Sequence, residues 1–571
     1  MKRIVRIFVI VLIASVLIMP MSVSAQKADP PGQLVSLQLL AFNDYHGHVL
    51  PTASGNVDGI PAGGGEYLSA KLKELRVGNK NSLTVAAGDL IGGSPAFSGL
   101  FHDEPSVESL NAMGLDVSSV GNHEFDEGVT ELLRMQKGGC HPVDGCYFPG
   151  QPFVGADFQW LAANVVSETT GKTALSPYWI TRIEGINVAF IGMTLEDTDT
   201  LVSASGIQGW DFLDEAATAN ALVPGLKKKG VNAIVVLLHE GGSQTPPPGD
   251  IDACVGISGP IVAINDALDP AIDAVITGHT HLPYNCVLSD PAGQPRIVTS
   301  AYSFGRVVSE VDLVLDKRTR DVRRDLSTSV NHLVEQAALT PDPAITAVIA
   351  KWQPLFDASG NIPVGSITAN INRGGVGGSD RGVESAAGNL VADAQLWATS
   401  SNGAQIAFMN PGGVRADFLV ANSPAGEAPG QITYREAYNV QPFSNILQTF
   451  DMTGAQIDTL LEQQWMVGRS AGEVLRLGIS DGFTYSWSSS APYGNKVDPA
   501  SIKLGGVTLD PNATYRVTAN SFIAEGGDSF TALVNGAPRT GGKVDLDALI
   551  DYFKANPNVG APAPARSTRV S

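Results

Sequence analysis

The chain has 571 residues, of which 43% are hydrophobic and only 16% are charged, so it can bury a sizeable core and widespread disorder is excluded. Acidic residues outnumber basic ones by 57 to 37, and the formal net charge of -20 disfavours a nucleic-acid polymer as partner. A small anionic substrate stays compatible with this charge, because a local metal ion or arginine cluster outweighs the global sign.

The first 25 residues have the pattern of a secretory signal peptide. Lys2, Arg3 and Arg6 form a basic segment, residues 7–19 form an apolar segment, and small residues at 22–25 provide a cleavage site. The alternative is an uncleaved membrane anchor, but the apolar segment is short for a span of about 20 residues. We therefore expect a secreted or periplasmic chain with no stable membrane span after cleavage; its oligomeric state is left open.

Apolar runs in residues 34–328 alternate with helix-like stretches, which is typical of an α/β domain. The predicted helix spans Gly65–Arg76. The predicted strands are Val35–Phe42, Leu83–Ala87, Val117–Val120, Asn187–Ile191, Ala233–Leu238 and Ala274–Thr277. Several of these runs are apolar throughout, as expected for strands that are buried on both faces.

Five of the apolar runs end in polar residues that can bind metal ions. The clusters begin at Asp44, Asp89, Asn122, His239 and His279. Open α/β sheets bind ligands beyond the carboxyl ends of their strands. A single sheet could therefore bring the five clusters to one place.

The four cysteines suggest disulfide bonds in an exported chain. Cys140 and Cys146 flank a loop that contains Pro142 and Gly145, which favours a local bridge, and Cys254 and Cys286 would then pair by elimination. A cysteine zinc site is the alternative, but the spacings do not form a CxxC pair.

The second half of the chain is expected to form a separate, smaller α/β domain. Residues 329–356 are predicted mainly helical, with interruptions at Pro341 and Pro343, and serve as a connector. A helix at Gly388–Thr399 and strands at Gln405–Met409 and Tyr515–Ala519 follow.

The strand-end clusters supply what a two-metal hydrolytic site needs. Two metal ions about 3.5–4 Å apart, bridged by a carboxylate, neutralise phosphoryl oxygens and make a nucleophile from water. The available ligands are Asp44, His46, Asp89, Asn122, His239, His279 and His281. Mixed nitrogen and oxygen ligands without thiolates suit two divalent ions, Zn or Mn first, with Co or Fe as alternatives.

Together these motifs resemble the calcineurin-like metallophosphoesterase superfamily, in the same order along the chain. The resemblance implies one ion held by Asp44, His46, Asp89 and His281, and another held by Asp89, Asn122, His239 and His279. It implies that His123 is a catalytic group rather than a ligand and that Asp126 orients it. A carboxylate beside an imidazole also fixes its tautomer and favours its protonated form.

Several features of the C-terminal half point to recognition of an anion and a base. Gly413 lies in a glycine-containing loop that permits close backbone approach, and Arg415 offers a bidentate fork. Arg373 and Arg381 supply two further positive charges for binding an anion. Phe443 and a second phenylalanine, Phe522, could stack a base at about 1–3 kcal/mol per base, with core packing as the alternative for each ring.

These blocks resemble the C-terminal domain of the 5'-nucleotidase family, which includes periplasmic 5'-nucleotidase/UDP-sugar hydrolases. The resemblance implies a nucleotide as small-molecule substrate, with binding residues Arg373, Arg381, Asn410, Gly413, Arg415, Phe443, Asn445, Phe522 and Asp528. Phe443 and Phe522 would stack the base, Asn445 would contact its edge and Asp528 would bind the ribose hydroxyls. The glycine-rich spacing before Arg381 departs from the family pattern and weakens the assignment of Arg373.

The fold implied is a two-domain α/β protein. A four-layer α/β/β/α metallophosphoesterase domain at 34–328 would be joined by a helical connector at 329–360 to a nucleotide-binding domain at 361–555, followed by a disordered tail at 556–571. In this family the domains rotate about the connector to carry substrate to the metal ions.

The function expected is that of an exported, metal-dependent 5'-nucleotidase that releases phosphate and nucleoside. The alternatives are a 2',3'-cyclic-nucleotide phosphodiesterase/3'-nucleotidase, a UDP-sugar hydrolase and, more distantly, a non-catalytic surface binding protein on the same scaffold.

Overall fold

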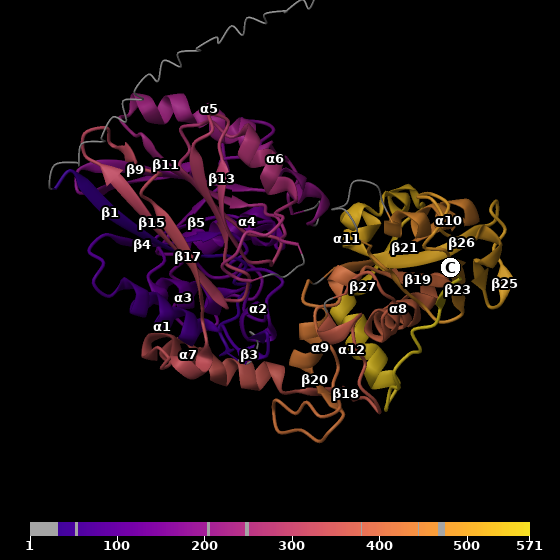
Figure 1. The fold of residues 1–571 in the computed structure, drawn as a ribbon. Coiled ribbons are helices and arrows are strands. Elements are labelled where there is room, and N and C mark those ends of the chain that lie inside the picture. Colours follow the sequence, from indigo (N-terminus) through magenta and orange to yellow (C-terminus); the bar gives the residue numbers. More distant parts are fainter. Residues whose placement is uncertain are drawn as a thin grey trace, which may run out of the picture.

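The computed structural model describes residues 32–51, 55–202, 206–245, 250–378, 380–443, 445–465 and 474–570. The expected signal peptide, residues 1–25, lies outside this part of the chain. Figure 1 shows two domains joined by one long helix, α7. None of the helices in the described ranges has the length and hydropathy that a bilayer crossing needs.

The N-terminal domain contains a seven-stranded sheet in which β1, β4, β5 and β6 run parallel and β15 is antiparallel to β1. Its strands are β1 (Leu34–Phe42), β4 (Ser82–Ala87), β5 (Val117–Ser119), β6 (Gln159–Leu161), β15 (Val307–Asp316), β16 (Asp321–Val322) and β17 (Thr328–Leu333). Strand β1 is buried on both faces, which explains its nearly continuous apolar sequence.

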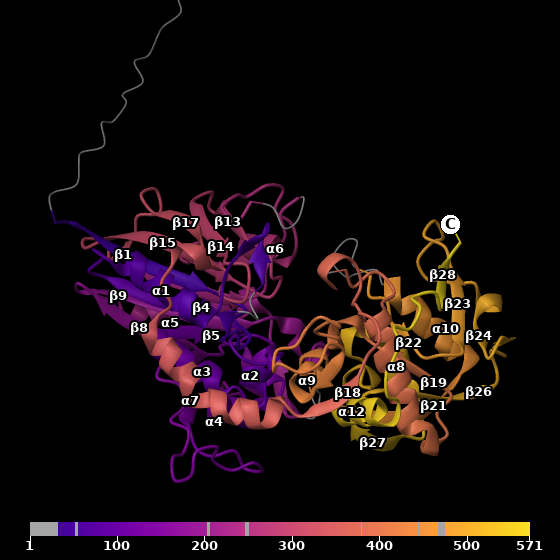
Figure 2. The same ribbon diagram turned by 90° about the horizontal axis from the view of Figure 1, so that it is seen from below.

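A second, six-stranded sheet lies against the first (Figure 2). Its members are β8 (Tyr178–Ile183), β9 (Ile186–Thr194), β11 (Ala233–His239), β12 (Ala274–Thr277), β13 (Tyr284–Ser289) and β14 (Pro295–Ser300). The five clusters therefore follow strands of two sheets, as the expected four-layer fold requires, and not strands of one sheet. Apolar runs reveal buried strands, but they do not reveal which strands pair with which.

Helices cover the outer faces and complete the expected four layers. Between the sheets, side chains such as Leu39 and Val235 form one core. On the outside of the first sheet lie α1 (Gly65–Arg76), α2 (Ala96–Gly99), α3 (Glu104–Met113) and α4 (Gly128–Lys137); on the outside of the second lie α5 (Glu215–Lys228) and α6 (Pro260–Ala267). The α/β/β/α fold is thus confirmed.

The connector differs from the prediction at its beginning. Residues 328–333 form β17, which pairs antiparallel with β15, so the segment expected to be helical from residue 329 belongs to the first sheet. The helix α7 (Pro343–Gly360) starts later, with Asp342 as its N-cap and Pro343 in the first turn. The two apolar residues of this segment, Val330 and Leu333, are three positions apart, a spacing that fits a helix, so the pattern gave no sign of a strand.

The C-terminal domain is built on a mixed five-stranded sheet in the order β22-β19-β26-β21-β27. These strands are β19 (Ile406–Met409), β21 (Ile446–Thr453), β22 (Gly478–Ile479), β26 (Thr514–Asn520) and β27 (Thr540–Val544). Its principal helices are α8 (Ala386–Thr399), α9 (Tyr434–Val440), α10 (Gly454–Glu462), α11 (Ser521–Ala524) and α12 (Asp545–Ala555). Beside α9 and α12, β18 (Pro363–Ser366) pairs with β20 (Gln431–Thr433).

The chain end is ordered through residue 570, so the expected disordered tail at 556–571 is a misprediction over its described part. Strand β28 (Ser567–Arg569) pairs parallel with β23 (Phe483–Trp487), within a small sheet that also holds β24 (Lys503–Leu504) and β25 (Val507–Thr508). Arg566 anchors this end through ion pairs to Asp393, 2.7 Å from Nη1 to Oδ1. Composition gives no sign of such distant partners.

Both expected disulfide bonds, Cys140–Cys146 and Cys254–Cys286, are formed. The described chain contains no free cysteine.

Candidate active site

The polar clusters after five strands meet at one point, where the two sheets end side by side. Asp44 Oδ1 lies 3.1 Å from His281 Nε2, and Asp89 Oδ2 lies 3.0 Å from His239 Nε2. The Nδ1 atom of His279 lies 3.1 Å from Asn122 Oδ1. All seven predicted metal ligands are therefore gathered here, contributed by both sheets rather than by one.

Asp89 occupies the centre of this set. Its carboxylate approaches His46 at 3.4 Å and His239 at 3.0 Å, although these two imidazoles belong to different parts of the set. Asp44 and Asp89 also form a group with His239 in which the ligand atoms lie within 4.8 Å of one another. A carboxylate in this position can bridge two ions.

The backbone at the site adopts an uncommon conformation. Five of the seven candidate ligands have a positive φ: Asp44, His46, Asp89, His279 and His281, with values between 45° and 70°. Left-handed backbone is rare outside glycine and costs of order 1–3 kcal/mol where it is strained. Its concentration on these residues indicates that the fold holds them in place for a purpose other than stability.

Glycines beside the ligands allow the clusters to approach closely. A Cβ atom on Gly88 would lie 2.6 Å from the nitrogen of Gly121, and one on Gly278 would lie 2.9 Å from Nδ1 of His239. Both distances are shorter than real Cβ contacts allow, so the glycines before Asp89 and His279 are sterically required.

The imidazoles are oriented by backbone carbonyls so that their Nε2 atoms face the carboxylates. Nδ1 of His239 donates to the carbonyl of Ala87 at 2.7 Å, and Nδ1 of His46 donates to the carbonyl of Gly92 at 2.7 Å. In the neutral form of each ring, the Nε2 atom therefore carries the lone pair that a metal ion would bind. The Nε2 of His46 lies 3.2 Å from the Nε2 of His281.

Two buried polar atoms at the centre lack a hydrogen-bond partner in the described chain, namely Asp44 Oδ1 and His239 Nε2. Buried acceptors without donors are costly, and converging acceptors of this kind fit a cation between them. The residues present thus suit divalent metal ions, with nitrogen and oxygen donors typical of Zn or Mn.

The electrostatics of the site reflect its excess of negative charge. Burial disfavours the charged form of His239, but the carboxylates of Asp89 and Asp44 outweigh this and raise its pKa to about 10. For Asp89, burial raises the pKa, yet the neighbouring imidazoles, His239 first, hold it well below its usual range. The carboxylates therefore favour positive charge beside them, which bound divalent metal ions would supply.

His123 forms a pair with Asp126, as predicted. Nδ1 of His123 donates to Asp126 Oδ2 at 2.8 Å, and its backbone N–H donates to Asp89 Oδ1 at 2.9 Å. Burial lowers the pKa of His123, but Asp126 and Asp89 together raise it above its ordinary value. A nitrogen of His123 also lies within 4.8 Å of ligand atoms of His46 and Asp89, so distance alone admits it as a ligand.

Glu124 has a supporting role that the sequence did not assign. Its buried carboxylate accepts hydrogen bonds from the backbone N–H groups of Asp89 at 2.9 Å and Leu90 at 2.8 Å, and also from that of Gly121. It thereby ties the loop after β4 to the loop after β5. The spacing in Gly-Asn-His-Glu signals the residue, but only the fold shows what it binds.

Two predicted substrate residues of the C-terminal domain reach the metal-ligand cluster. The ring of Phe443 stacks on His123 with centroids 5.8 Å apart, and the guanidinium of Arg415 lies 5.6 Å from the Phe443 centroid. Burial, with Arg381 and Arg373 nearby, lowers the pKa of Arg415 to about 10. The cations of the second domain thus gather beside the anionic centre of the first.

Other predicted residues lie deeper in the C-terminal domain. Asn410 donates to Asp528 at 2.8 Å, and the space beside Gly412, the neighbour of Gly413, is bordered by Arg381 and Asp528. These groups form one polar cluster.

Three predicted residues are engaged elsewhere. Arg373 pairs with Asp417 at 3.0 Å. The amide of Asn445 contacts Asp545 and Ser521, each at 3.3 Å. Phe522 packs against the core of the C-terminal domain that contains Phe408 and Phe450.

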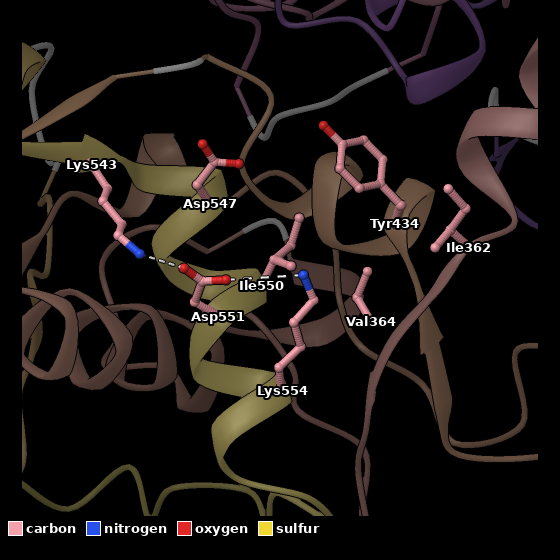
Figure 3. Close-up of a pocket in the computed structure, with 8 residues that line it drawn as sticks. All are labelled: Ile362, Val364, Tyr434, Lys543, Asp547, Ile550, Asp551 and Lys554. Carbon is pink, nitrogen blue, oxygen red and sulfur yellow. Dashed lines mark hydrogen bonds and ion pairs between the residues drawn. The ribbon is translucent and has the colours of Figure 1, made fainter.

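A cavity of about 460 Å³ in the C-terminal domain lies away from this site (Figure 3). Its lining residues are Ile362, Val364, Tyr434, Lys543, Asp547, Ile550, Asp551 and Lys554. Lys543 and Asp551 form an ion pair at 2.5 Å, and none of the predicted site residues lines the cavity.

Comparison with known proteins supports both halves of the chain. The family model described as calcineurin-like phosphoesterase matches residues 37–283, and that of the 5'-nucleotidase C-terminal domain matches residues 363–535. The cell wall protein Lmo0130 of Listeria monocytogenes is 33% identical over 548 residues, which cover 92% of this chain and 68% of that protein.

Two further similarities extend over almost the whole chain. The endonuclease YhcR of Bacillus subtilis is 33% identical over 93% of this chain, but the match spans only 40% of that relative's length. The solved structure of a 5'-nucleotidase precursor from Thermus thermophilus superimposes with a TM-score of 0.73 at 27% identity, and the match covers 94% of this chain and 100% of that one.

Proposed function

The chain belongs to the 5'-nucleotidase family of phosphoester hydrolases, and from this premise we propose that it is an exported, metal-dependent 5'-nucleotidase. It would hydrolyse phosphate esters or anhydrides of nucleotides and release phosphate and nucleoside. The observation that carries the proposal is the approach of Phe443 and Arg415 to the cluster of metal-ligating side chains, since this joins a base-stacking ring and a phosphate-binding cation to a phosphoesterase centre.

We assign one metal ion to Asp44, His46, Asp89 and His281, and the other to Asp89, Asn122, His239 and His279. Zn or Mn is the preferred pair, and Co or Fe the alternative. When bound, the ions neutralise charge on the phosphoryl oxygens and activate water.

The chain's own residues bind the substrate, orient it and supply a proton. His123, held by Asp126, keeps a proton available beside the phosphoryl group and stabilises the charge that develops there. Distance and a free Nε2 admit His123 as a ligand. We assign it the catalytic role because the resemblance to the metallophosphoesterases places this histidine outside the ligand set. Arg415 and Arg381 bind phosphate oxygens, and Phe443 holds the base.

The remaining substrate contacts depend on the arrangement of the domains. Phe522, Asn445 and Asp528 would complete the nucleoside site with Phe443 once the second domain turns about α7, because Phe443 packs on His123 in this structure. Arg373, which pairs with Asp417, would contribute charge rather than direct contact.

Export is supported by the N-terminal sequence and by the two disulfide bonds, which form in oxidising compartments. The similarity to a protein named as a cell wall protein agrees with this location.

The test is a substrate panel on the zinc- or manganese-loaded chain, with products separated by chromatography. The panel holds 5'-AMP, ATP, 3'-AMP, 2',3'-cyclic AMP, UDP-glucose and single-stranded DNA. We expect 5'-AMP or ATP to have the highest kcat/KM. A preference for 3'-AMP and the cyclic nucleotide would instead favour the phosphodiesterase/3'-nucleotidase alternative, and cleavage of DNA alone would reject a nucleotide substrate. Silence across the panel would favour the non-catalytic binding protein.

A further inference from the structure

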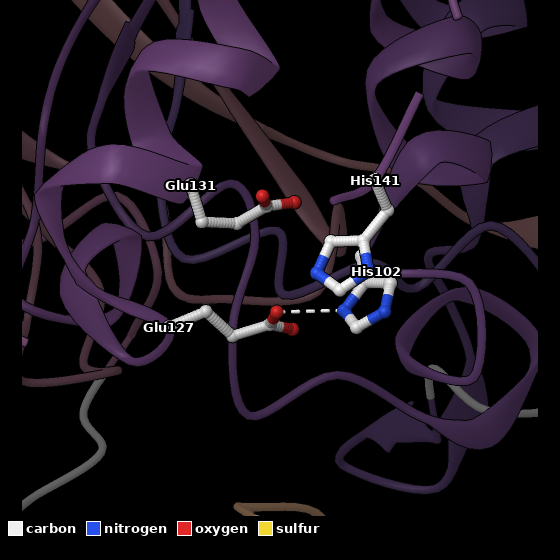
Figure 4. A group of neighbouring side chains, drawn as sticks. All are labelled: His102, Glu127, Glu131 and His141. Carbon is white, nitrogen blue, oxygen red and sulfur yellow. Dashed lines mark hydrogen bonds and ion pairs between the residues drawn. The ribbon is translucent and has the colours of Figure 1, made fainter. Parts of the chain in front are cut away.

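A second cluster of metal-binding side chains lies outside the active site, on the N-terminal domain (Figure 4). It consists of His102, Glu127, Glu131 and His141, and each of them offers one ligand atom within 4.8 Å of the others. None of these residues belongs to the seven candidate ligands of the active site. We call this set the histidine–glutamate cluster.

The side chains of this cluster come from three separate segments. His102 lies between α2 and α3, Glu127 and Glu131 lie at the start of α4, and His141 lies in the loop closed by the Cys140–Cys146 disulfide. Figure 4 shows the two imidazoles on one side and the two carboxylates on the other. Residues so far apart in sequence converge here only because the loop folds back onto α4.

The two imidazole rings are stacked, with centroids 3.7 Å apart and an interplanar angle of 19°. Stacking of two rings that could both be protonated places like charges together. The pKa of His141 is lowered by burial and by the neighbouring His102, which favours the neutral ring that a ligand requires. Burial lowers the pKa of His102, but Glu127 and Asp144 outweigh it and raise the pKa to about 9, so a bound ion would replace the His102 proton. The side chain of His141 is only 13% exposed.

The backbone at His102 is held in an unusual conformation. His102 and its neighbour Asp103 have φ values of 48° and 57°, which are uncommon for residues other than glycine. Nδ1 of His102 lies 2.6 Å from Glu127 Oε2, and its Nε2 lies 2.8 Å from Asp144 Oδ2. Asp144 comes from the same disulfide loop as His141, and it can serve as an outer partner that orients a ligating imidazole.

Glu131 remains able to bind a cation although Arg134 contacts it. Nε of Arg134 donates to Oε1 and Oε2 of Glu131 at 2.9 and 3.0 Å, and Nη2 donates to Oε1 at 2.7 Å. Each carboxylate oxygen has two lone pairs, so the contacts with the guanidinium leave Glu131 with lone pairs that can bind a cation on the side of the imidazoles. Nη1 of Arg134 is also paired with Glu104 at 2.7 Å, which divides its charge between the two carboxylates.

From this geometry we propose that the histidine–glutamate cluster is a third metal site, which binds a divalent first-row transition ion such as Zn²⁺ through His102, Glu127, Glu131 and His141. Two imidazoles and two carboxylates form a four-coordinate set suited to Zn²⁺ and unsuited to Mg²⁺ or Ca²⁺, which prefer oxygen ligands. With all four positions filled by protein, the site would be structural rather than catalytic.

The bound ion would fix the disulfide loop to α4 and, through it, to the connector. Tyr147 and Phe148 in the continuation of this loop pack on Trp352 of α7, with centroids 5.8 and 4.8 Å away. Metal binding at the cluster would therefore rigidify the surroundings of the connector.

The experiment compares bound zinc in the wild type and in the His102→Ala/His141→Ala variant. Both are loaded with Zn²⁺, dialysed against a weak competing chelator and analysed by mass spectrometry of the metal. His332→Ala is the matched control, since His332 also pairs with a carboxylate, Glu310 at 2.8 Å, but lies outside both metal clusters. Activity on the best substrate is measured on the same samples.

We expect the double variant to hold one zinc equivalent fewer per chain than the wild type, with kcat preserved within about twofold, while the control loses none. Equal zinc content in the variant and the wild type would overturn the proposal. Loss of zinc with proportional loss of activity would also overturn it, because the missing ion would then come from the active site. If circular dichroism shows the double variant misfolded, His141→Ala alone is judged by the same criteria.

This design separates the third site from the proposed function. The comparison rests on the difference between variant and wild type, so it holds whatever the total zinc content and whichever substrate is preferred.

Discussion

The ring of Phe443, from the C-terminal domain, stacks on His123, from the N-terminal domain, with centroids 5.8 Å apart and planes 21° from parallel. The side chain expected to hold the base thus covers the residue expected to act on the phosphate. This contact places the two halves of one proposed site within reach of each other, and it implies that a bound base must displace or replace the His123–Phe443 stack.

Replacing Phe443 with alanine should weaken nucleotide binding. We expect Phe443→Ala to raise KM for 5'-AMP about tenfold, because base stacking contributes about 1–3 kcal/mol and 1.4 kcal/mol is tenfold. Hydrolysis of a small generic phosphodiester, bis(p-nitrophenyl) phosphate, should change far less. Phe148→Ala, which removes a phenylalanine that packs on Trp352 away from the site, is the control. Equal losses on both substrates would refute a base-stacking role.

Removing the partner of His123 should shift the pH profile. In the wild type, burial lowers the pKa of His123 but Asp126 helps to raise it above its ordinary value, so the protonated form persists to higher pH. In Asp126→Asn this support is lost and the pKa of His123 falls. The decline of activity on the alkaline side of the pH profile should therefore begin at a lower pH than in the wild type. We also expect kcat to fall about 100-fold, within the range of general acid–base effects. Glu310→Gln, which removes the carboxylate beside His332, should leave the profile unchanged; an unshifted profile in Asp126→Asn would contradict the assignment.

Loss of the Glu124 carboxylate should loosen the metal-binding loops. In Glu124→Gln one acceptor oxygen becomes a donor, so at least one of the buried N–H groups of Asp89, Leu90 and Gly121 loses its partner. An unsatisfied buried group costs about 1–3 kcal/mol. We expect a lower melting temperature and weaker zinc binding by titration calorimetry. Glu184→Gln, which alters a surface ion pair, is the matched control, and identical behaviour of the two variants would disprove the role.

Removal of metal should destabilise the N-terminal domain. Asp44 Oδ1 and His239 Nε2 are buried without hydrogen-bond partners, and a bound ion satisfies both. Ligand binding to the folded state alone contributes about 2.7 kcal/mol at a hundredfold excess over Kd. Scanning calorimetry should therefore show that chelation lowers Tm and that Zn²⁺ or Mn²⁺ restores it. In His239→Ala, the added ion should not restore Tm. A Tm that does not change on chelation would count against a metal centre.

The sequence predicted the position of the site because its signals are local. A buried strand followed by a polar cluster can be read from a few residues, as at Asp44 or His239, and the carboxyl ends of parallel strands share one edge. The helix Gly65–Arg76 was predicted with its observed limits for the same reason.

The failures concern contacts between distant segments. The pairing of β17 with β15 and the order at the chain end depend on distant partners. One such partner is Asp393, which holds Arg566 from 173 positions away. The support that Glu124 gives to Asp89 and the convergence of His102 with His141 are likewise invisible until the chain is folded. Periodicity and composition carry no information on such pairings.

The most direct test of the account is release of phosphate from 5'-AMP by the wild type and by Asp89→Asn, each freed of metal and then reloaded with zinc or manganese. Asp89 is the residue that both proposed metal sites share. We expect the reloaded wild type to release phosphate and the metal-free chain to release none. We expect Asp89→Asn to stay inactive with either ion while remaining folded by circular dichroism. Undiminished activity in Asp89→Asn, or in the metal-free wild type, would contradict it.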